Sequence, residues 1–214
     1  MSTAPALFET EVPAAAAAGP RPAPAAGIPR VIGLDVAMGI TGIAGEGWTD
    51  YVKAKGTSQH SRFEQQLAGI ADHTRHADLV AIEGAAYGHN NNGADALAAM
   101  RWMVRHDLWK RRIPYVVITP GQRMIYAVGT AAPKDPGTGA RLKGDALKGA
   151  LRQAVADTYG ITTEGPARYD EADAYILMAM ALHWLGYPLA VVGDDRRRAL
   201  DSVRWPDRAT VTAR

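Results

Sequence analysis

The stretch PRVIGLDVAMGITGIAGEGWTDYVKAKG, residues 29–56, decides the fold. Residues 31–36 are almost all apolar and contain one carboxylate, Asp35, near the end of the run. Two further strand-like runs follow at residues 39–46 and 48–53. Because the connections between the three runs are only a few residues long, neighbouring runs must pair antiparallel. The stretch therefore predicts three antiparallel strands, of which the first is buried.

The chain after residue 56 alternates between helical and strand-like patterns. Phe63, Leu67 and Ile70 recur at helical spacing, and short apolar runs at residues 77–84 and 113–120 are typical of buried strands. Helices are predicted at residues 58–77, 94–112, 122–128 and 145–159, and from residue 170 onward. Helical crossovers make the last two strands parallel to the first. We expect an α/β fold with a mixed five-stranded sheet, three antiparallel strands followed by two parallel ones, flanked by helices.

Composition divides the chain into three parts. Residues 1–29 are rich in alanine and proline without periodicity, which predicts a disordered tail. Residues 30–190 are expected to form one folded domain. Residues 191–214 carry six arginines among four aspartates and are expected to be a basic, mobile tail.

The overall composition excludes several classes of protein. The chain has no cysteine, which excludes disulfide frameworks and cysteine-based zinc sites and fits a reducing, cytoplasmic location in a bacterial cell or a phage-infected host. No apolar run reaches the roughly 20 residues that span a bilayer. Net charge is +2, but residues 101–152 hold eleven Lys and Arg against three Asp, a local charge of +8. Such a stretch predicts a surface for a polyanion, including DNA contacts from Arg141 and Lys143.

Three carboxylates open the apolar helix in PARYDEADAYILMAMALHW, residues 166–184: Asp170, Glu171 and Asp173. Asp170 could be an N-cap, with Asp173 completing a capping-box-like pair, since acidic residues are favoured at helix starts. Alternatively, Asp170 and Asp173 are metal ligands, because residues three apart share a helix face.

Carboxylates elsewhere favour the metal site. Asp35 and Glu83 each end a buried strand, where an unpaired charge costs several kcal/mol. If the two strands are parallel neighbours, these ends lie together, and Asp170 and Asp173 can complete the cluster. Oxygen ligands select hard cations, so we expect two Mg²⁺ ions, for which Mn²⁺ can substitute. Paired ions of this kind promote phosphoryl displacement.

Three motifs resemble those of the RuvC family of Holliday junction resolvases, within the retroviral-integrase/RNase H superfamily. VIGLDVAMGITGIA is similar to the first family motif, LVAIEG to the second, and YDEADAYILMAMALHW to the last, over about residues 30–187. The resemblance implies an RNase H-like fold and cleavage of branched DNA. It implies the following roles: metal ligation by Asp35, Glu83, Asp170 and Asp173; DNA contact near the site by Lys148, which is also expected to be catalytic, and by Arg123; and action at the junction point by the aromatic Tyr87.

The sequence departs from the family pattern after the first aspartate. The family has Pro-Gly-Ser there, whereas this chain has Val36, Ala37 and Met38, and the loop of residues 130–143 is longer than in the family. These departures put the family's sequence preference in doubt. They fit a divergent or phage-type member.

Two further pairs of residues have a spacing that suggests a role. Trp102 and Trp109 share one stripe of the helix at residues 94–112, for which core packing is the default interpretation. The resemblance implies the alternative, the interface of a homodimer, because the family pairs through this helix. His73 and His76 have metal-like spacing, but they are expected to be solvated histidines.

These features predict a metal-dependent, structure-selective endonuclease that resolves four-way and related branched DNA by two-metal hydrolysis, as a homodimer. Recombination or branch-migration proteins are possible partners. One alternative is an RNase H-like nuclease acting on RNA–DNA hybrids or flaps, and another is a DNA-binding module without catalysis. An actin-like kinase is excluded, because the chain has no room for the second lobe.

Overall fold

The computed structural model describes residues 27–85 and 93–212 of the chain. The elements follow in the order β1 (Val31–Val36), β2 (Ile40–Gly45), β3 (Trp48–Lys53), α1 (Gln59–Thr74), β4 (Leu79–Glu83), α2 (Ala94–Lys110), β5 (Tyr115–Ile118), α3 (Pro120–Val128), α4 (Gly144–Tyr159), α5 (Arg168–Leu185), α6 (Asp194–Arg197), the 3₁₀ helix η1 (Leu200–Ser202) and α7 (Arg208–Thr212).

The strands form one mixed sheet in the order β3-β2-β1-β4-β5. β1 pairs antiparallel with β2, and β2 pairs antiparallel with β3, whereas β4 lies parallel to β1 and β5 parallel to β4. The predicted fold class is therefore confirmed, with three antiparallel strands followed by two parallel ones. β1 is the central strand, so residues near its end have neighbours on both sides.

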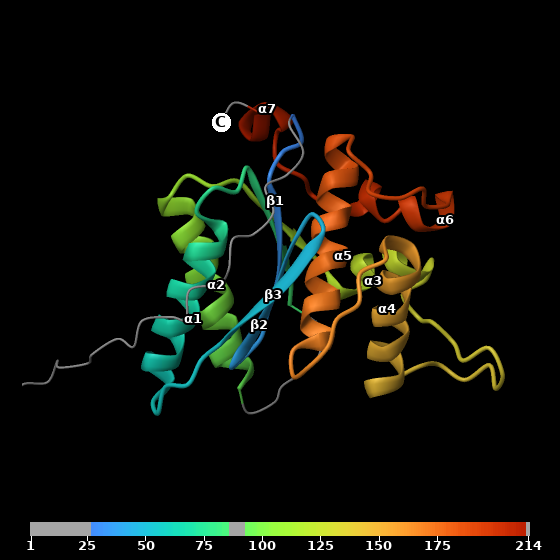
Figure 1. Cartoon of the computed structure of the whole chain (residues 1–214), viewed down its shortest axis with the longest axis horizontal. Coiled ribbons are helices and arrows are strands. Elements are labelled where there is room, and N and C mark those ends of the chain that lie inside the picture. The colour runs from blue at the N-terminus through green and yellow to red at the C-terminus, as the bar shows by residue number, and fades with distance from the viewer. Residues whose placement is uncertain (1–26, 86–92, 213–214) are drawn as a thin grey trace, which may run out of the picture.

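Helices cover both faces of the sheet (Figure 1). α1 and α2 lie on one face, where their apolar residues pack on Ile32, Leu34 and Ile82. α5, α3 and α4 lie on the other face, over Val31, Leu79 and their neighbours. Thirteen of the eighteen residues of α5 are buried, because it is enclosed between the sheet and the two outer helices. This explains why α5 is apolar on all sides.

Two glycines allow α5 to lie unusually close to the sheet. A Cβ atom at Gly33 would lie 2.0 Å from the carbonyl oxygen of Ala174, and one at Gly42 would lie 2.1 Å from that of Asp170. Neither distance is sterically possible, so only glycine fits at these positions. The backbone of α5 therefore rests directly on β1 and β2, with its first turn above Gly42.

The start of α5 differs from the prediction. The helix begins at Arg168, two residues earlier than expected, and its N-cap is Ala167, whose side chain makes no capping bond. Asp170 is therefore inside the helix, and the interpretation of Asp170 as an N-cap is wrong. Just before this helix Thr163 is buried, and its hydroxyl donates a hydrogen bond to the carbonyl of Arg168.

His73 is not the solvated histidine that the sequence suggested. Its ring is buried, with Nε2 2.9 Å from Asp50 Oδ2 and Nδ1 2.6 Å from the carbonyl oxygen of Gly69. The pair joins α1 to β3. The prediction failed because the polar end of α1 packs against the strand that supplies Asp50, and this partner is 23 residues away in the chain.

The segment after α5 packs on the domain, whereas the sequence suggested a mobile tail. Ala199, Leu200 and Val203 are buried against the core that α3 and α5 share. The rings of Trp184 and Trp205 stack with centroids 4.8 Å apart, and Trp205 Nε1 donates a hydrogen bond of 2.8 Å to the carbonyl of Leu200. The arginines of the segment hid this apolar pattern, because their charges dominate its composition.

Loss of this stack should destabilise the domain. We expect Trp205→Ala to lower the free energy of unfolding by about 2 kcal/mol, because burial and ring stacking both disappear. Trp205→Phe keeps the stacking. Its free energy of unfolding should fall by about 1 kcal/mol or less, because only the hydrogen bond is lost. Urea denaturation of both variants measures the difference. Equal stability of Trp205→Ala and the wild type would show that the segment does not pack in solution.

None of the helices in the described part of the chain combines the length and the apolar character needed to cross a membrane.

Candidate active site

Asp35 and Glu83 lie side by side where β1 and β4 end. The parallel register pairs Leu34 with Ile82, so the next residue on each strand is one of the two acids. Both side chains are buried, and strand alternation directs both toward the face that α5 covers. This placement agrees with the expectation from the sequence that the two carboxylates lie together at the C-terminal ends of neighbouring parallel strands.

α5 brings two more carboxylates to the same place. Asp35 is paired with Gly42 across β1 and β2, and the backbone of Asp170 rests on Gly42. Asp170 is half-buried and Asp173, one turn further along α5, is buried. The close approach of α5 at the glycines is thus what carries its first turn to the strand ends.

The electrostatics of the cluster show how close the carboxylates are. Burial raises the pKa of Asp35 well above its usual range, and the neighbouring Glu83 raises that pKa further, both by its charge and by a hydrogen bond. Burial also raises the pKa of Asp170, which the nearby Lys148 ammonium partly opposes. The protein therefore holds acidic groups where ionisation is unfavourable. A nearby cation would relieve this.

Arg123 extends into the middle of the cluster from α3. Its Nη2 lies 3.0 Å from Glu83 Oε1, and its Nη1 forms an ion pair with Asp173 Oδ1. The position follows from local structure: β5 ends at Ile118, opposite Glu83, and the Thr119 and Gln122 capping box starts α3 immediately afterwards. Arg123, one turn into the helix, then faces the strand ends.

Arg101 is a site residue that the sequence analysis did not identify. It lies on α2, and its Nη2 is 3.6 Å from Glu83 Oε2, with a side chain only 12% exposed. The sequence did contain a signal for this role. Met100, Val104 and Leu108 form the buried stripe of α2, and Arg101 lies next to Met100, at the edge of that stripe. A charged residue at the edge of a buried stripe needs a partner, and here that partner is Glu83.

Lys148 lies beside the cluster and is exposed. Its Nζ is 5.7 Å from the centre of the Tyr169 ring, and its charge lowers the pKa of Asp170. Lys148 therefore lies at the solvent-exposed side of the carboxylates.

The other predicted DNA-binding residues lie outside the cluster. Arg141 and Lys143 are exposed in the segment between α3 and α4, where Lys134 and Arg141 pair as a single β-bridge. This segment extends away from the body of the domain (Figure 1). Tyr87 falls outside the described residues.

The carboxylates as they stand do not form a ready-made metal site. Within residues 27–85 and 93–212, no three His, Asp or Glu side chains are arranged to hold a metal ion together. The guanidinium of Arg123 lies between Glu83 and Asp173 and forms an ion pair with each. The four carboxylates nevertheless offer the oxygen ligands that a hard divalent cation prefers. Two of them, Asp35 and Asp170, have a raised pKa, which a bound cation would lower.

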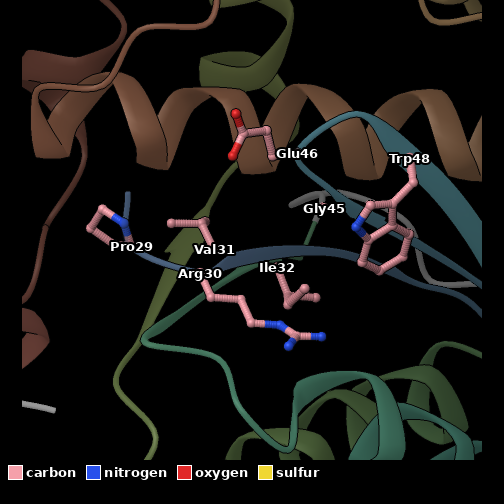
Figure 2. Close-up of a pocket in the computed structure, with 7 residues that line it drawn as sticks. All are labelled: Pro29, Arg30, Val31, Ile32, Gly45, Glu46 and Trp48. Atoms are coloured by element: carbon pink, nitrogen blue, oxygen red, sulfur yellow. The ribbon is translucent and has the colours of Figure 1, made fainter. Parts of the chain in front are cut away.

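A pocket lies at the other end of the sheet. It is lined by residues at the start of β1 and at the turn between β2 and β3, namely Pro29, Arg30, Val31, Ile32, Gly45, Glu46 and Trp48 (Figure 2). Because β1 runs from this pocket toward Asp35, the pocket is separate from the carboxylate cluster.

The strand order, the mixed pairing and the helices on both faces define an RNase H-like fold of the RuvC type. The chain is similar in structure to RuvC from Thermus thermophilus, with a TM-score of 0.54 and 16% sequence identity, over 76% of this chain and 99% of that one. It is also similar to T. thermophilus RuvC in complex with a Holliday junction substrate, with a TM-score of 0.49, 13% identity and the same coverage. No protein-family model matches the sequence, and no curated protein sequence matches it. At these identities the likeness shows the fold.

Proposed function

We propose that this protein is a metal-dependent endonuclease that cuts branched DNA, and four-way junctions in particular. The observation that carries the proposal is the gathering of Asp35, Glu83, Asp170 and Asp173 at the strand ends of an RNase H-like sheet. Their motifs resemble those of the resolvase family, and basic side chains surround them. A binding module without catalysis has no use for buried, mutually repelling carboxylates.

Asp35, Glu83, Asp170 and Asp173 would hold Mg²⁺, or Mn²⁺ in its place. When bound, such cations activate water and stabilise the departing 3′ oxygen of a phosphodiester. Lys148, at the exposed side of the cluster, would hold the phosphate and stabilise its developing charge. The products would carry 5′-phosphate and 3′-hydroxyl ends.

The test is cleavage of several DNA structures in parallel. The protein is incubated with four-way, three-way, flap, RNA–DNA hybrid and linear substrates in Mg²⁺, and the products are resolved on denaturing gels. Preferred cutting of the four-way junction supports the proposal. If the flap or the hybrid is cut preferentially, that structure is the substrate instead of the four-way junction, and the proposed metal-dependent site still stands. No cutting of any substrate would leave the binding module as the better interpretation.

The segment of residues 130–143 should contact the DNA backbone outside the cluster. We expect Arg141→Ala and Lys143→Ala to reduce the slope of log K against log salt by about one unit for each phosphate that the variant no longer neutralises. Arg75→Ala is the matched control, since Arg75 is also exposed but lies at the end of α1, on the other face of the sheet. Binding titrations across salt concentrations give the slopes. Slopes equal to those of the wild type and the control would place the segment away from DNA.

We also propose that the protein acts as a homodimer formed through α2. Trp102 and Trp109 are 64% and 68% exposed. The two tryptophans therefore do not pack in the core of their own chain, which was the other interpretation of their stripe. Met103 is exposed next to them, and His106 stacks on Trp109. An exposed apolar stripe of this kind marks an interaction surface. A two-fold dimer would present two equivalent sites to the two equivalent strands of a four-way junction.

Trp109→Glu should therefore separate the dimer without unfolding the chain. We expect the wild type to sediment as a dimer and to linearise a supercoiled plasmid that carries a cruciform, because both strands are cut in one binding event. Trp109→Glu should sediment as a monomer and release nicked circles. Lys110→Glu is the control, since it places the same charge at the adjacent exposed position beside the stripe. A wild-type monomer that yields only nicked circles would overturn both the dimer and the coordinated cutting.

A further inference from the structure

The position of Arg123 raises a problem for any cation in the cluster. The guanidinium contacts Glu83 and Asp173 at the same time, and its side chain is only 8% exposed. A magnesium ion needs carboxylate oxygens at about 2.0–2.1 Å in near-octahedral geometry. An ion bound by these two carboxylates would lie next to the buried guanidinium between them, and two positive charges that close together repel each other. The cation and Arg123 therefore compete for Glu83 and Asp173.

The arginine also acts as the counter-charge of the cluster. Arg123 lowers the pKa of both Asp35 and Asp170, although burial and the neighbouring acids raise these pKa values overall. Arg101 adds a second positive charge 3.6 Å from Glu83, from the opposite face of the sheet. Removing one partner of a buried ion pair leaves an uncompensated charge. The two arginines thus allow the carboxylates to be buried together when no metal ion is bound.

The bonding of Arg123 is incomplete in this arrangement. Its Nε is buried and meets no hydrogen-bond acceptor among the described residues, and the same holds for Nε of Arg101. A buried donor without an acceptor destabilises the folded protein. A phosphate group offers several oxygens to the planar fork of a guanidinium, and it is a preferred partner of arginine. An arriving phosphodiester therefore supplies what Arg123 lacks in the free protein.

We propose that Arg123 is an internal substitute for the cation, which moves from Glu83 and Asp173 to a phosphate when nucleic acid binds, and so couples metal binding to nucleic-acid binding. Arg123 thereby acts as a positioning residue for the carboxylates. The coupling works in both directions, because each ligand favours the same displaced state of the arginine. It rests on the proposed metal site, but it is independent of which DNA structure the protein prefers.

The experiment measures Mn²⁺ affinity by electron paramagnetic resonance of free Mn²⁺, without any cleavage readout. Wild type, Arg123→Met and Arg152→Met are titrated alone. Arg152 is a matched control, a half-buried arginine on α4 that donates to the carbonyl of Thr163. If about a tenth of wild-type molecules have the arginine displaced, removing it should tighten Mn²⁺ binding about tenfold. Arg152→Met should bind Mn²⁺ as the wild type does.

A second titration uses the wild type with a linear phosphodiester duplex, checked on a gel to be intact afterwards, and with the uncharged methylphosphonate duplex of the same sequence. Mn²⁺ bound by each duplex alone is subtracted. The phosphodiester should tighten Mn²⁺ binding to the wild type several-fold and to Arg123→Met by a smaller factor, whereas the methylphosphonate should have no effect. If Arg123→Met does not fold, this wild-type comparison still decides.

Weaker or equal Mn²⁺ binding by folded Arg123→Met would overturn the proposal, because it would make the arginine a support of the metal site instead of a competitor. Equal Mn²⁺ binding to the wild type with and without the phosphodiester would overturn it too. Neither result affects the proposed nuclease activity, which the cleavage assay tests separately. Conversely, a protein that cuts none of the substrates but shows both shifts would keep the coupling and lose the proposed reaction.

Discussion

Asp35→Asn is expected to abolish cleavage and, at the same time, to make the metal-free protein more stable. Loss of cleavage should be at least about a thousand-fold, as when a group directed at the developing charge of a reaction is removed. DNA affinity should stay or rise, because the variant removes a negative charge facing phosphate. The gain in stability has a separate origin, in the burial of this carboxyl group.

The sign of the stability change follows from the pKa of Asp35. Burial and Glu83 raise that pKa in the folded state above its value in the unfolded chain. The unfolded chain therefore ionises more readily, and the free energy of unfolding falls as pH rises from the ordinary carboxyl range through the raised pKa. Asparagine does not ionise, so this loss should disappear. At pH 7 we expect a rise in Tm of at least about 2 °C, the shift that roughly 1 kcal/mol produces in a chain of this size.

Melting curves in EDTA between pH 5 and pH 8 measure this effect. The difference in Tm between Asp35→Asn and the wild type should grow with pH. Asp157→Asn, which changes an exposed carboxyl on α4, should show no such growth. A variant that cuts at near the wild-type rate would mean that Asp35 is not part of the active site, and a variant less stable than the wild type at pH 7 would contradict the electrostatic argument.

Gly33→Ala should severely damage the fold. The new methyl group would meet the carbonyl oxygen of Ala174 and the backbone nitrogen of Met178, both in α5, at 2.0 and 2.9 Å. Backbone atoms cannot rotate out of the way, so the whole helix must shift. We expect a loss of at least about 3 kcal/mol in the free energy of unfolding, the upper end for overpacking. The shift would also draw Asp170 and Asp173 away from Asp35, so the folded fraction should cut poorly.

Gly149→Ala is the matched control for this substitution. Gly149 lies within α4 with open space around its Cα, so alanine fits and should stabilise the helix by about 0.5–1 kcal/mol. Urea denaturation compares the two variants. If Gly33→Ala were as stable as the wild type, α5 would not lie on β1 as closely as described.

The sequence predicted the sheet because its signals are local. Short connections require hairpins, and helical crossovers require parallel strands, so residues 31–53 and the two later apolar runs were sufficient to predict the directions of the five strands, whereas their order comes from the structure. Asp35 and Glu83 were expected to meet on the condition that their two parallel strands are neighbours, and the pairing of β1 with β4 meets that condition. Neither expectation depends on how side chains pack.

Contacts between distant segments could not be predicted in this way. The bonds from Arg123 to Glu83 and Asp173 depend on how α3 packs, which no local pattern specifies. The stack of Trp184 on Trp205 joins two residues in different segments, and the arginines between them suggested a solvated tail. Arg101 was hidden for a similar reason, because it lay within a stretch whose positive charge pointed to solvent and DNA.

The position of α5 in the chain has a consequence for the protein during its synthesis. α5 is the helix that lies directly on one face of the sheet, beneath α3 and α4, yet it comes after all five strands. A nascent chain that has reached only α4 therefore exposes the apolar residues of that face and lacks Asp170 and Asp173. The ribosome thus releases the last two acids together with the helix that completes the core, and an unfinished chain has neither a stable fold nor the groups proposed to cut DNA.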